Sequence, residues 1–290
     1  MTRDLQGYGG KWPDVRWPGG ARVAVSIVVN FEEGGELTVS GGDARNEAVY
    51  EVVDEKQGPD PGIESHFAYG TRAGYWRIVD ALNRFNAKAT FSACGRAVEA
   101  APWLARDAVE RGHEVAAHGY RWVTHAGMSE AEERESIVRS IEAIEAATGR
   151  RPVGWHTRAP ATPRTRALLV EYGFLYDSDA YDDDLPYFAD VGGRRHLVLP
   201  YAFDTNDMHF QHSDRFTTAA SFATYVTDAF DCLCREGERW PRMMSIGLHL
   251  RMIGRPGRIA ALDRILAHVG ALGWLTTREA IARHWLEHAA

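Results

Sequence analysis

The sequence predicts an α/β fold, a distorted (β/α) barrel of about seven parallel strands. Two observations lead to this prediction. Short apolar runs recur along the chain, and most are separated by segments in which apolar residues repeat every three to four positions. The first run, residues 22–31, is almost continuously apolar and β-branched, as expected for a strand that is buried on both faces of a parallel sheet.

The first half of the chain alternates strand-like and helix-like segments. After the first run, a helical pattern over residues 69–85 leads into a second strand-like run at residues 87–93. Residues 114–117 form the next predicted strand. Ser129 and Glu132 then form a capping box, which predicts the start of another helix.

The same alternation continues to the end of the chain. Further strands are predicted at residues 153–155, 174–176, 196–201 and 243–250. The helices predicted among and after them cover residues 163–172, 221–236, 258–269 and 278–285. The length of 290 residues fits one barrel or two small domains, and the regular alternation favours a single catalytic domain over residues 1–290.

One long segment lacks this regularity. Residues 34–70 are rich in Gly, Glu and Asp and show little periodicity. Such a segment is either disordered or a functional lid. We favour a lid, because the segment begins at an acidic cluster.

The composition excludes several classes of protein. The formal net charge of -7 leaves no surplus of basic side chains to neutralise phosphates, so we expect no nucleic-acid partner. No apolar run approaches the ~20 residues of a membrane span. Residues 1–17 are polar and lack the features of a signal peptide. We therefore expect a cytoplasmic protein with no membrane partner, and we also expect a homo-oligomer.

Reactive side chains follow the predicted strands at their C-terminal ends, where α/β barrels place their active sites. These residues are Glu32 and Glu33 after the first strand, His118 after the third, Arg158 after the fourth, Asp177 and Asp179 after the fifth, the segment 204–207 after the sixth, and His249 at the end of the seventh. We expect His249 to face Glu32 across the mouth of the barrel.

These residues lie in motifs that resemble those of the polysaccharide deacetylase family. Residues 30–34 resemble the family's TFDDG motif, with Glu32 and Glu33 in place of both aspartates. Residues 112–118 resemble its HxxxH motif, residues 158–161 its RxPYG motif, and residues 248–249 its leucine-histidine motif. The four motifs occur in the family's order. The resemblance implies a barrel that hydrolyses a carbon–nitrogen bond.

Longer stretches resemble the metal-independent allantoinase branch of this family, which also includes cyclic-imide hydrolases. They cover residues 30–36, 69–74, 118–122, 176–181, 204–208 and 254–258, whereas residues 154–160 fit the branch's pattern only in part. The resemblance implies a cyclic amide or ureide as substrate, with allantoin as the first candidate. It also implies substrate contacts from Glu36, Trp122, Asp179, Asn206, Asp207 and Arg255.

The metal site of the family's deacetylases is incomplete in this sequence. Those enzymes hold a divalent metal through the second Asp of the first motif and two histidines four residues apart. The corresponding residues here are Glu33, His118 and Trp122. An indole only donates a hydrogen bond, so Glu33 and His118 are the remaining candidate ligands. We therefore expect that no cofactor is required, and a residual zinc site is the less favoured alternative.

Without a metal, side chains must activate water and polarise the carbonyl. We expect Glu32 to be the general base, and Glu33 to raise the pKa of one carboxyl of the pair by like-charge repulsion. His249 is the candidate acid for the leaving nitrogen. Arg158 is expected to anchor a substrate carboxylate or to hold the base. His118 completes the predicted catalytic set.

Two other functions remain open on the sequence alone. One is metal-dependent removal of the acetyl group from an N-acetylated sugar. The other, from a different class, is a catalytically inactive protein that binds a small molecule. The second is disfavoured because such a protein is expected to lose its base, whereas Glu32, Arg158 and His249 are all present.

Overall fold

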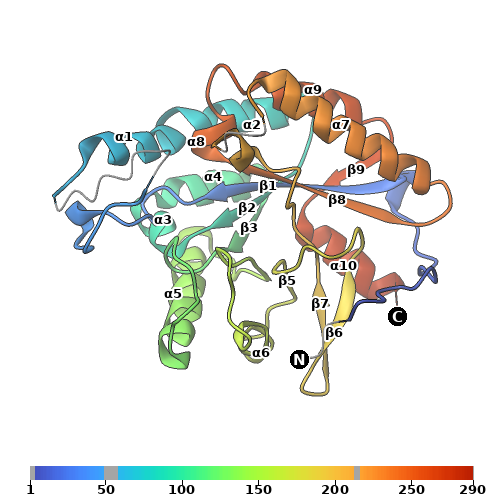
Figure 1. Cartoon of the computed structure of the whole chain (residues 1–290), viewed down its shortest axis with the longest axis horizontal. Coiled ribbons are helices and arrows are strands. Elements are labelled where there is room, and N and C mark those ends of the chain that lie inside the picture. The colour runs from blue at the N-terminus through green and yellow to red at the C-terminus, as the bar shows by residue number, and fades with distance from the viewer. Residues whose placement is uncertain (1–3, 49–57, 212–215, 290) are drawn as a thin grey trace.

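A single curled sheet of mainly parallel strands forms the centre of the molecule (Figure 1). The computed structural model describes residues 4–48, 58–211 and 216–289. Its strands are β1 (Val23–Phe31), β2 (Thr90–Ala93), β3 (Glu114–Ala117), β4 (Gly154–Trp155), β5 (Tyr176–Asp177), β6 (Tyr187–Val191), β7 (Arg194–Val198), β8 (Arg242–His249) and β9 (Gly273–Thr276). They are ordered β6-β7-β5-β4-β3-β2-β1-β8, and β9 also pairs with β1. The predicted distorted barrel is confirmed.

Each predicted strand is present, with shifted ends, and two strands were not predicted. β6 pairs with β7 in an antiparallel hairpin, and its residues are mostly half-buried, so it lacks a continuous apolar run. β9 has only four residues, Gly273–Thr276, and lies beside the first half of β1. Short or partly exposed strands leave a weak pattern in a sequence, which explains both omissions.

Helices cover the outside of the sheet; α7 lies along β8 and β1, and α9 packs against α7 (Figure 1). The helices are α1 (Pro61–Tyr69), α2 (Tyr75–Arg84), α3 (Gly95–Ala100), α4 (Pro102–Glu110), α5 (Glu130–Thr148), α6 (Thr165–Glu171), α7 (Ala219–Glu236), α8 (Leu250–Ile253), α9 (Ala260–Val269) and α10 (Arg278–His288). The predicted capping box begins α5. The helices α1, α3, α4 and α8 were not predicted, and α1 lies within the segment 34–70, for which no regular structure was expected.

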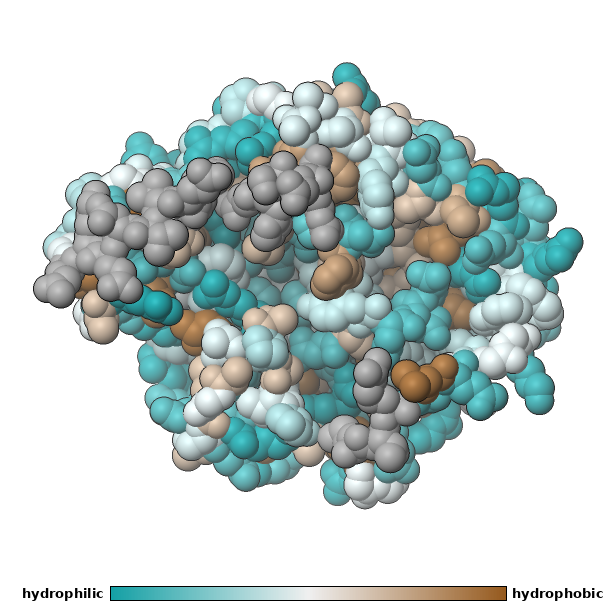
Figure 2. Space-filling model, in the orientation of Figure 1, coloured by the Kyte–Doolittle hydropathy of each residue, from teal (hydrophilic) through white to brown (hydrophobic). Residues whose placement is uncertain are grey.

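The outer surface is mainly hydrophilic on the face shown in Figure 2, where apolar residues are scattered among polar ones. This distribution agrees with the charged content of 25%. None of the helices in the described ranges combines the length and apolar character that a membrane span requires.

Strand β1 places the candidate base by simple alternation. All nine of its residues are buried, and side chains of successive residues point to opposite faces. Val25, Ile27 and Val29 belong to the core beneath the outer helices. Asn30 therefore points to the barrel interior, where its side chain donates to the Tyr201 hydroxyl at 2.9 Å. Glu32, two residues further on, lies at the interior end of the same face.

A close backbone contact fixes the helix that follows β8. The π-helical turn η3 (Gly70–Gly74) joins α1 to α2 and packs against α8. A Cβ atom on Gly254 would lie 2.4 Å from the Cα of Gly74 and 2.4 Å from the carbonyl oxygen of Leu250. Both neighbours are backbone atoms, so neither can move aside easily. This contact determines where α8 presents its side chains.

Gly254→Ala is expected to lower the free energy of unfolding by about 1–3 kcal/mol, because the added methyl overpacks the contact between η3 and α8. Denaturant unfolding of purified protein measures the change. Gly257→Ala is the matched control, since a Cβ at Gly257 meets no atom within 4 Å. Equal free energies of unfolding for Gly254→Ala and Gly257→Ala would show that the close contact between η3 and α8 does not exist.

Candidate active site

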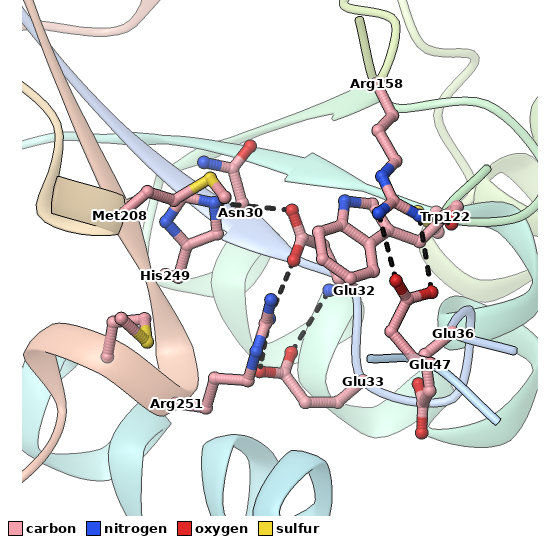
Figure 3. A network of polar contacts seen from close by, with 12 residues as sticks. Asn30, Glu32, Glu33, Glu36, Glu47, Trp122, Arg158, Met208, His249 and Arg251 are labelled. Atoms are coloured by element: carbon pink, nitrogen blue, oxygen red, sulfur yellow. Dashed lines mark hydrogen bonds and ion pairs between the residues drawn. The ribbon is translucent and has the colours of Figure 1, made fainter. Parts of the chain in front are cut away.

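Glu32 is the centre of a buried polar cluster at the C-terminal ends of β1, β3 and β8. Its Oε1 lies 3.5 Å from Nε2 of His118 and 3.4 Å from Nε2 of His249. Its Oε2 accepts a hydrogen bond of 2.7 Å from Nη1 of Arg251 (Figure 3). All four residues are at most 3% exposed. A carboxylate buried so deeply requires these partners to remain charged.

His249 lies beside Glu32 and not across the barrel mouth, so that part of the prediction is wrong. β8 pairs in parallel with β1, and His249 is the register partner of Asn30. The sequence cannot show which strands become neighbours, because β1 and β8 are separated by most of the chain. The contact between the two side chains is nevertheless present.

Asp207 fixes the His249 ring. One carboxylate oxygen lies 2.6 Å from Nδ1, and the other accepts the backbone N–H groups of His249 and Ile253 at 2.9 and 3.0 Å. Burial alone would lower the pKa of His249, but the charges of Glu32 and Asp207 raise it to about 9. The ring is therefore an imidazolium at neutral pH. A proton on Nε2 is available to a substrate.

The His118 ring is held by a backbone carbonyl. Its Nδ1 lies 2.7 Å from the carbonyl oxygen of His156. A carbonyl oxygen only accepts, so Nδ1 carries the proton in the neutral ring. Nε2 then presents a lone pair toward Glu32. His118 is consequently arranged as a proton acceptor in the space beside Glu32.

The two adjacent carboxyls differ in their protonation. Burial would raise the pKa of Glu32, but the charges of Arg251 and His249, with the hydrogen bond from His249, hold it well below its usual range. Burial raises the pKa of Glu33 to about 7. The negative charge of Glu32 adds to this increase, and the positive charge of Arg251 opposes it. The raised pKa in the pair therefore belongs to Glu33 and not to Glu32, the predicted base.

Glu33 faces away from the space beside the two histidines. One of its carboxylate oxygens accepts the backbone N–H of Glu32 at 3.1 Å, and the other lies 3.5 Å from Nη1 of Arg251. The carboxyl packs so tightly against Gly70 that a Cβ there would lie 2.2 Å from Oε1. Both oxygens are thus engaged, although the pKa would suit a base.

Arg251, which was not predicted from the sequence, supplies the cation of the site. Its guanidinium lies 4.4 Å from the ring centre of Phe67 and 4.9 Å from that of Trp122. Burial would lower its pKa, but Glu32 and Glu33 raise it above the usual range. Its Nε has no hydrogen-bond partner in the described ranges. A charged residue within the apolar segment 250–253, directly after the leucine-histidine motif, was the available signal.

Arg158 contacts the predicted lid and not the base. Its guanidinium stacks 3.8 Å from the ring centre of Trp122, donates to the Trp122 carbonyl at 2.7 Å, and binds both carboxylate oxygens of Glu47 at 3.0 and 3.3 Å (Figure 3). The expectation that Arg158 holds the base is wrong, because Arg251 occupies that position. Its other predicted role, anchoring a substrate carboxylate, stays a prediction.

The described part of the segment 34–70 packs against the site on one side. Glu47 binds Arg158, and Asp43 forms a two-pronged ion pair with Arg121, with nitrogen–oxygen distances of 2.6 and 2.5 Å. Arg121 also donates to the Glu36 carbonyl at 3.0 Å. Residues 49–57 of the predicted lid lie outside the described ranges.

Four predicted substrate contacts bind neighbouring protein groups. Asp179 accepts from the backbone and hydroxyl of Thr157, both at 2.7 Å, and Asn206 accepts from the N–H of Met208 at 2.9 Å. Glu36 accepts from the N–H of Gly34, and Arg255 stacks 3.6 Å from the ring centre of Tyr69. These contacts hold the loops that carry the catalytic candidates. A substrate contact from any of the four side chains stays a prediction.

The residues present do not fit the family's divalent metal. Glu33 is bound to Arg251 and to backbone, Nε2 of His118 faces Glu32, and Trp122 stacks its indole on two guanidinium groups. Across residues 4–48, 58–211 and 216–289, no group of three or more His, Cys, Asp or Glu side chains is arranged to hold a metal ion. A metal near Glu32 and Glu33 would also be repelled by the guanidinium of Arg251.

Comparison with known proteins identifies the family. Residues 55–174 match the sequence profile of polysaccharide deacetylase. A Schizosaccharomyces pombe protein named as a polysaccharide deacetylase is 37% identical to this chain, over 98% of this chain and 97% of its own length. The chain belongs to the polysaccharide deacetylase family. This polysaccharide deacetylase homologue is therefore a carbon–nitrogen hydrolase, which confirms the predicted class of enzyme.

Two solved structures are similar over nearly their whole length. The structure of a polysaccharide deacetylase from Pseudomonas aeruginosa PAO1 is 45% identical, covers 99% of this chain and 98% of its own, and has a TM-score of 0.94. The structure of Puue allantoinase is 44% identical, with coverage of 99% and 98% and a TM-score of 0.93. Both support the fold of this family member, and the second agrees with the resemblance seen in the sequence.

Asp207→Asn is expected to destabilise the protein at neutral pH. Because the pKa of His249 is raised from 6.5 to about 9, its stabilising charge is fully present below pH 6.5 and is lost as the pH rises through about 9. The difference in unfolding free energy between wild type and variant should therefore shrink above that pH. Denaturant unfolding of both proteins below pH 6.5 and above pH 9 measures this difference in unfolding free energy.

Asp231→Asn is the matched control for this experiment. It removes the partner of His268, which lies 2.7 Å away in an exposed pair, and exposed pairs contribute about 0–1 kcal/mol. A pH-independent loss in Asp207→Asn would contradict the proposed charge on His249.

Proposed function

We propose that this protein is a metal-independent hydrolase that opens a cyclic amide or ureide, with allantoin as the first candidate substrate. The position of Arg251 is the observation that supports this most directly. Its fixed positive charge contacts Glu32 at 2.7 Å and lies 3.5 Å from Glu33, where the family's metal would need a free carboxylate. The similarity to Puue allantoinase supports the class of substrate.

Glu32 and His118 together activate the water in this proposal. Glu32 remains a carboxylate at neutral pH, because its pKa is held low, and it accepts a hydrogen bond from the water. Its low pKa also makes it a weak proton acceptor. The lone pair on Nε2 of His118 faces the same space, so His118 takes the proton. Glu32 then stabilises the resulting imidazolium. This assignment revises the sequence-based expectation that Glu32 itself is the base.

Arg251 acts on the carbonyl oxygen of the substrate, and His249 acts on the leaving nitrogen. The free Nε–H of Arg251 donates to the carbonyl oxygen as negative charge develops there. The water oxygen bonds to the carbonyl carbon and the carbon–nitrogen bond breaks. The leaving nitrogen receives the proton from Nε2 of His249, while Asp207 holds the ring in place. The products are a carboxylic acid and a free N–H end of the opened ring.

Hydrolysis is expected to survive exhaustive dialysis against a chelator, because Arg251 supplies the positive charge that a metal would otherwise provide. The assay uses metal-analysed protein with allantoin, hydantoins, cyclic imides and N-acetylglucosamine oligomers. Activity lost on dialysis and restored by one equivalent of zinc would overturn the proposal. Activity confined to the sugar oligomers would instead favour the N-deacetylase alternative.

Glu32→Gln is expected to reduce kcat by on the order of a hundredfold or more, with a smaller change in KM, since an amide can hold the water but cannot stabilise the imidazolium of His118. Steady-state kinetics on the best ring substrate measure both constants. Glu145→Gln, on the exposed side of α5, is the control for removing one carboxylate. Unchanged turnover in Glu32→Gln would remove Glu32 from this role and point to Glu33.

A further inference from the structure

Several buried polar atoms inside the barrel lack partners. In the described ranges, Asn30 Oδ1, Ser92 Oγ and both ring nitrogens of His156 accept or donate no hydrogen bond. The three residues are at most 8% exposed, and Asn30 and Ser92 are register partners on β1 and β2. A buried polar atom that is left unsatisfied is destabilising. Asn30 donates to the Tyr201 hydroxyl, and Ser92 and His156 line one hollow with Tyr201, so the unsatisfied atoms lie around one side chain and indicate that something polar binds there.

His156 lies between the catalytic side chains and a small interior hollow. Its ring stacks on His118, with centres 4.8 Å apart and planes inclined by 18°, and lies 4.2 Å from the ring centre of Tyr201. With Ser92 and Tyr201 it lines a hollow of about 10 Å³. A hollow of this size accommodates about one water molecule. One water can thus satisfy one ring nitrogen, and the other nitrogen still needs a partner.

The hydrogen-bonding character of these groups is fixed by their neighbours. Burial, followed by the charges of His118 and Arg278, holds the pKa of His156 well below its usual range, so the ring is neutral with one N–H and one lone pair. The Asn30 amide nitrogen donates to the Leu248 carbonyl at 3.0 Å. Its Oδ1 is therefore the free end, and it only accepts. The groups around Tyr201 thus offer a donor from His156 and an acceptor from Asn30.

We propose that His156 and Asn30 bind the polar edge of the substrate ring and select an unsubstituted edge with carbonyl and N–H side by side. This inference rests on the proposed function and specifies which rings that function accepts. His156 donates to the carbonyl oxygen and Asn30 Oδ1 accepts from the N–H. A ring holds its amide cis, with both groups on one edge. An acyclic acetamide prefers the trans form and presents them on opposite edges.

The position also explains a departure from the allantoinase pattern. His156 lies within residues 154–160, which fit the allantoinase branch only in part. Asp179 holds this loop by its two hydrogen bonds to Thr157. His156, directly after β4 and stacked on His118, is well placed to set which ring is accepted.

Binding of unreactive rings tests this without any turnover. The full chain is titrated with ethyleneurea and with its N,N′-dimethyl analogue, and affinities are measured by NMR. Wild type is expected to prefer the unmethylated ring by at least ~tenfold, the ratio that one hydrogen bond supplies. Asn30→Leu should reduce the preference to below ~twofold, because the acceptor for the ring N–H is lost. His156→Phe should weaken the binding of both rings alike, since both keep the carbonyl, and His156→Gln, which keeps a donor, should restore part of that affinity.

His113→Phe is the matched control. His113 is another buried histidine with one unpartnered nitrogen, but it precedes β3 at the opposite end of the strands. Its variant should keep the full preference. Wild-type protein labelled with ¹⁵N gives a second measurement that needs no variant: the His156 ring and Asn30 side-chain resonances should shift with ethyleneurea, and the Asn30 resonances should shift less with the dimethyl analogue.

The outcomes separate this inference from the proposed function. An equal preference in wild type and Asn30→Leu, an undiminished affinity in His156→Phe, or no binding of ethyleneurea to wild type would overturn the inference even if the protein opens cyclic amides. A preference that depends on Asn30, with an affinity that depends on His156, in a protein that opens no ring would uphold the inference and refute the proposed function.

Discussion

The contact between Glu32 and Arg251 organises the site. A carboxylate that is 1% exposed can remain charged only with a close cation, and Arg251 provides one at 2.7 Å. The two residues are 219 positions apart, so the pair also ties the end of β1 to α8. The close approach of Gly74 and Gly254 holds α8 where this contact is possible. The backbone of the barrel and the charge of the site are therefore coupled.

From this pair follows the distribution of protons among the neighbouring groups. Glu32 stays ionised and raises the pKa of His249, which Asp207 raises further, so His249 keeps a proton to donate. The His156 carbonyl fixes the proton of His118 on Nδ1, so Nε2 can accept one. One imidazole is thus prepared as an acid and the other as a base. Their different environments, and not their residue type, make this distinction.

Much of this arrangement could be predicted from the sequence, because parallel strands bring their C-terminal ends to one edge. Glu32, His118 and His249 could be grouped on that basis alone. Arg251 and Glu47 could not, since each acts through a contact with a residue far away in the chain. Local hydrophobic periodicity predicts neither the strand order nor the pairing of β8 with β1.

The predicted substrate contacts show a second limit. Resemblance marks a position as important without saying what its side chain touches. Asp179, Asn206 and Arg255 were expected to contact substrate, yet their observed partners are protein groups that hold the surrounding loops. His156 shows the reverse case. Its importance lies in two unpartnered nitrogens, and a hydrogen bond that is missing leaves no pattern in a sequence.

Replacing a divalent metal by a guanidinium has a chemical consequence for the substrate. A metal lowers the pKa of its bound water and so provides hydroxide at neutral pH. Arg251 carries its charge to the carbonyl oxygen but cannot deprotonate water, so the water must lose its proton to a side chain during attack. The nucleophile is then weaker, and the carbonyl has to be more reactive. In a cyclic imide or ureide the amide nitrogen is shared with a second carbonyl, which makes each carbonyl carbon more electrophilic than that of an acetamide. In the proposed function, the incomplete metal site and the preference for a ring substrate are therefore two aspects of one constraint.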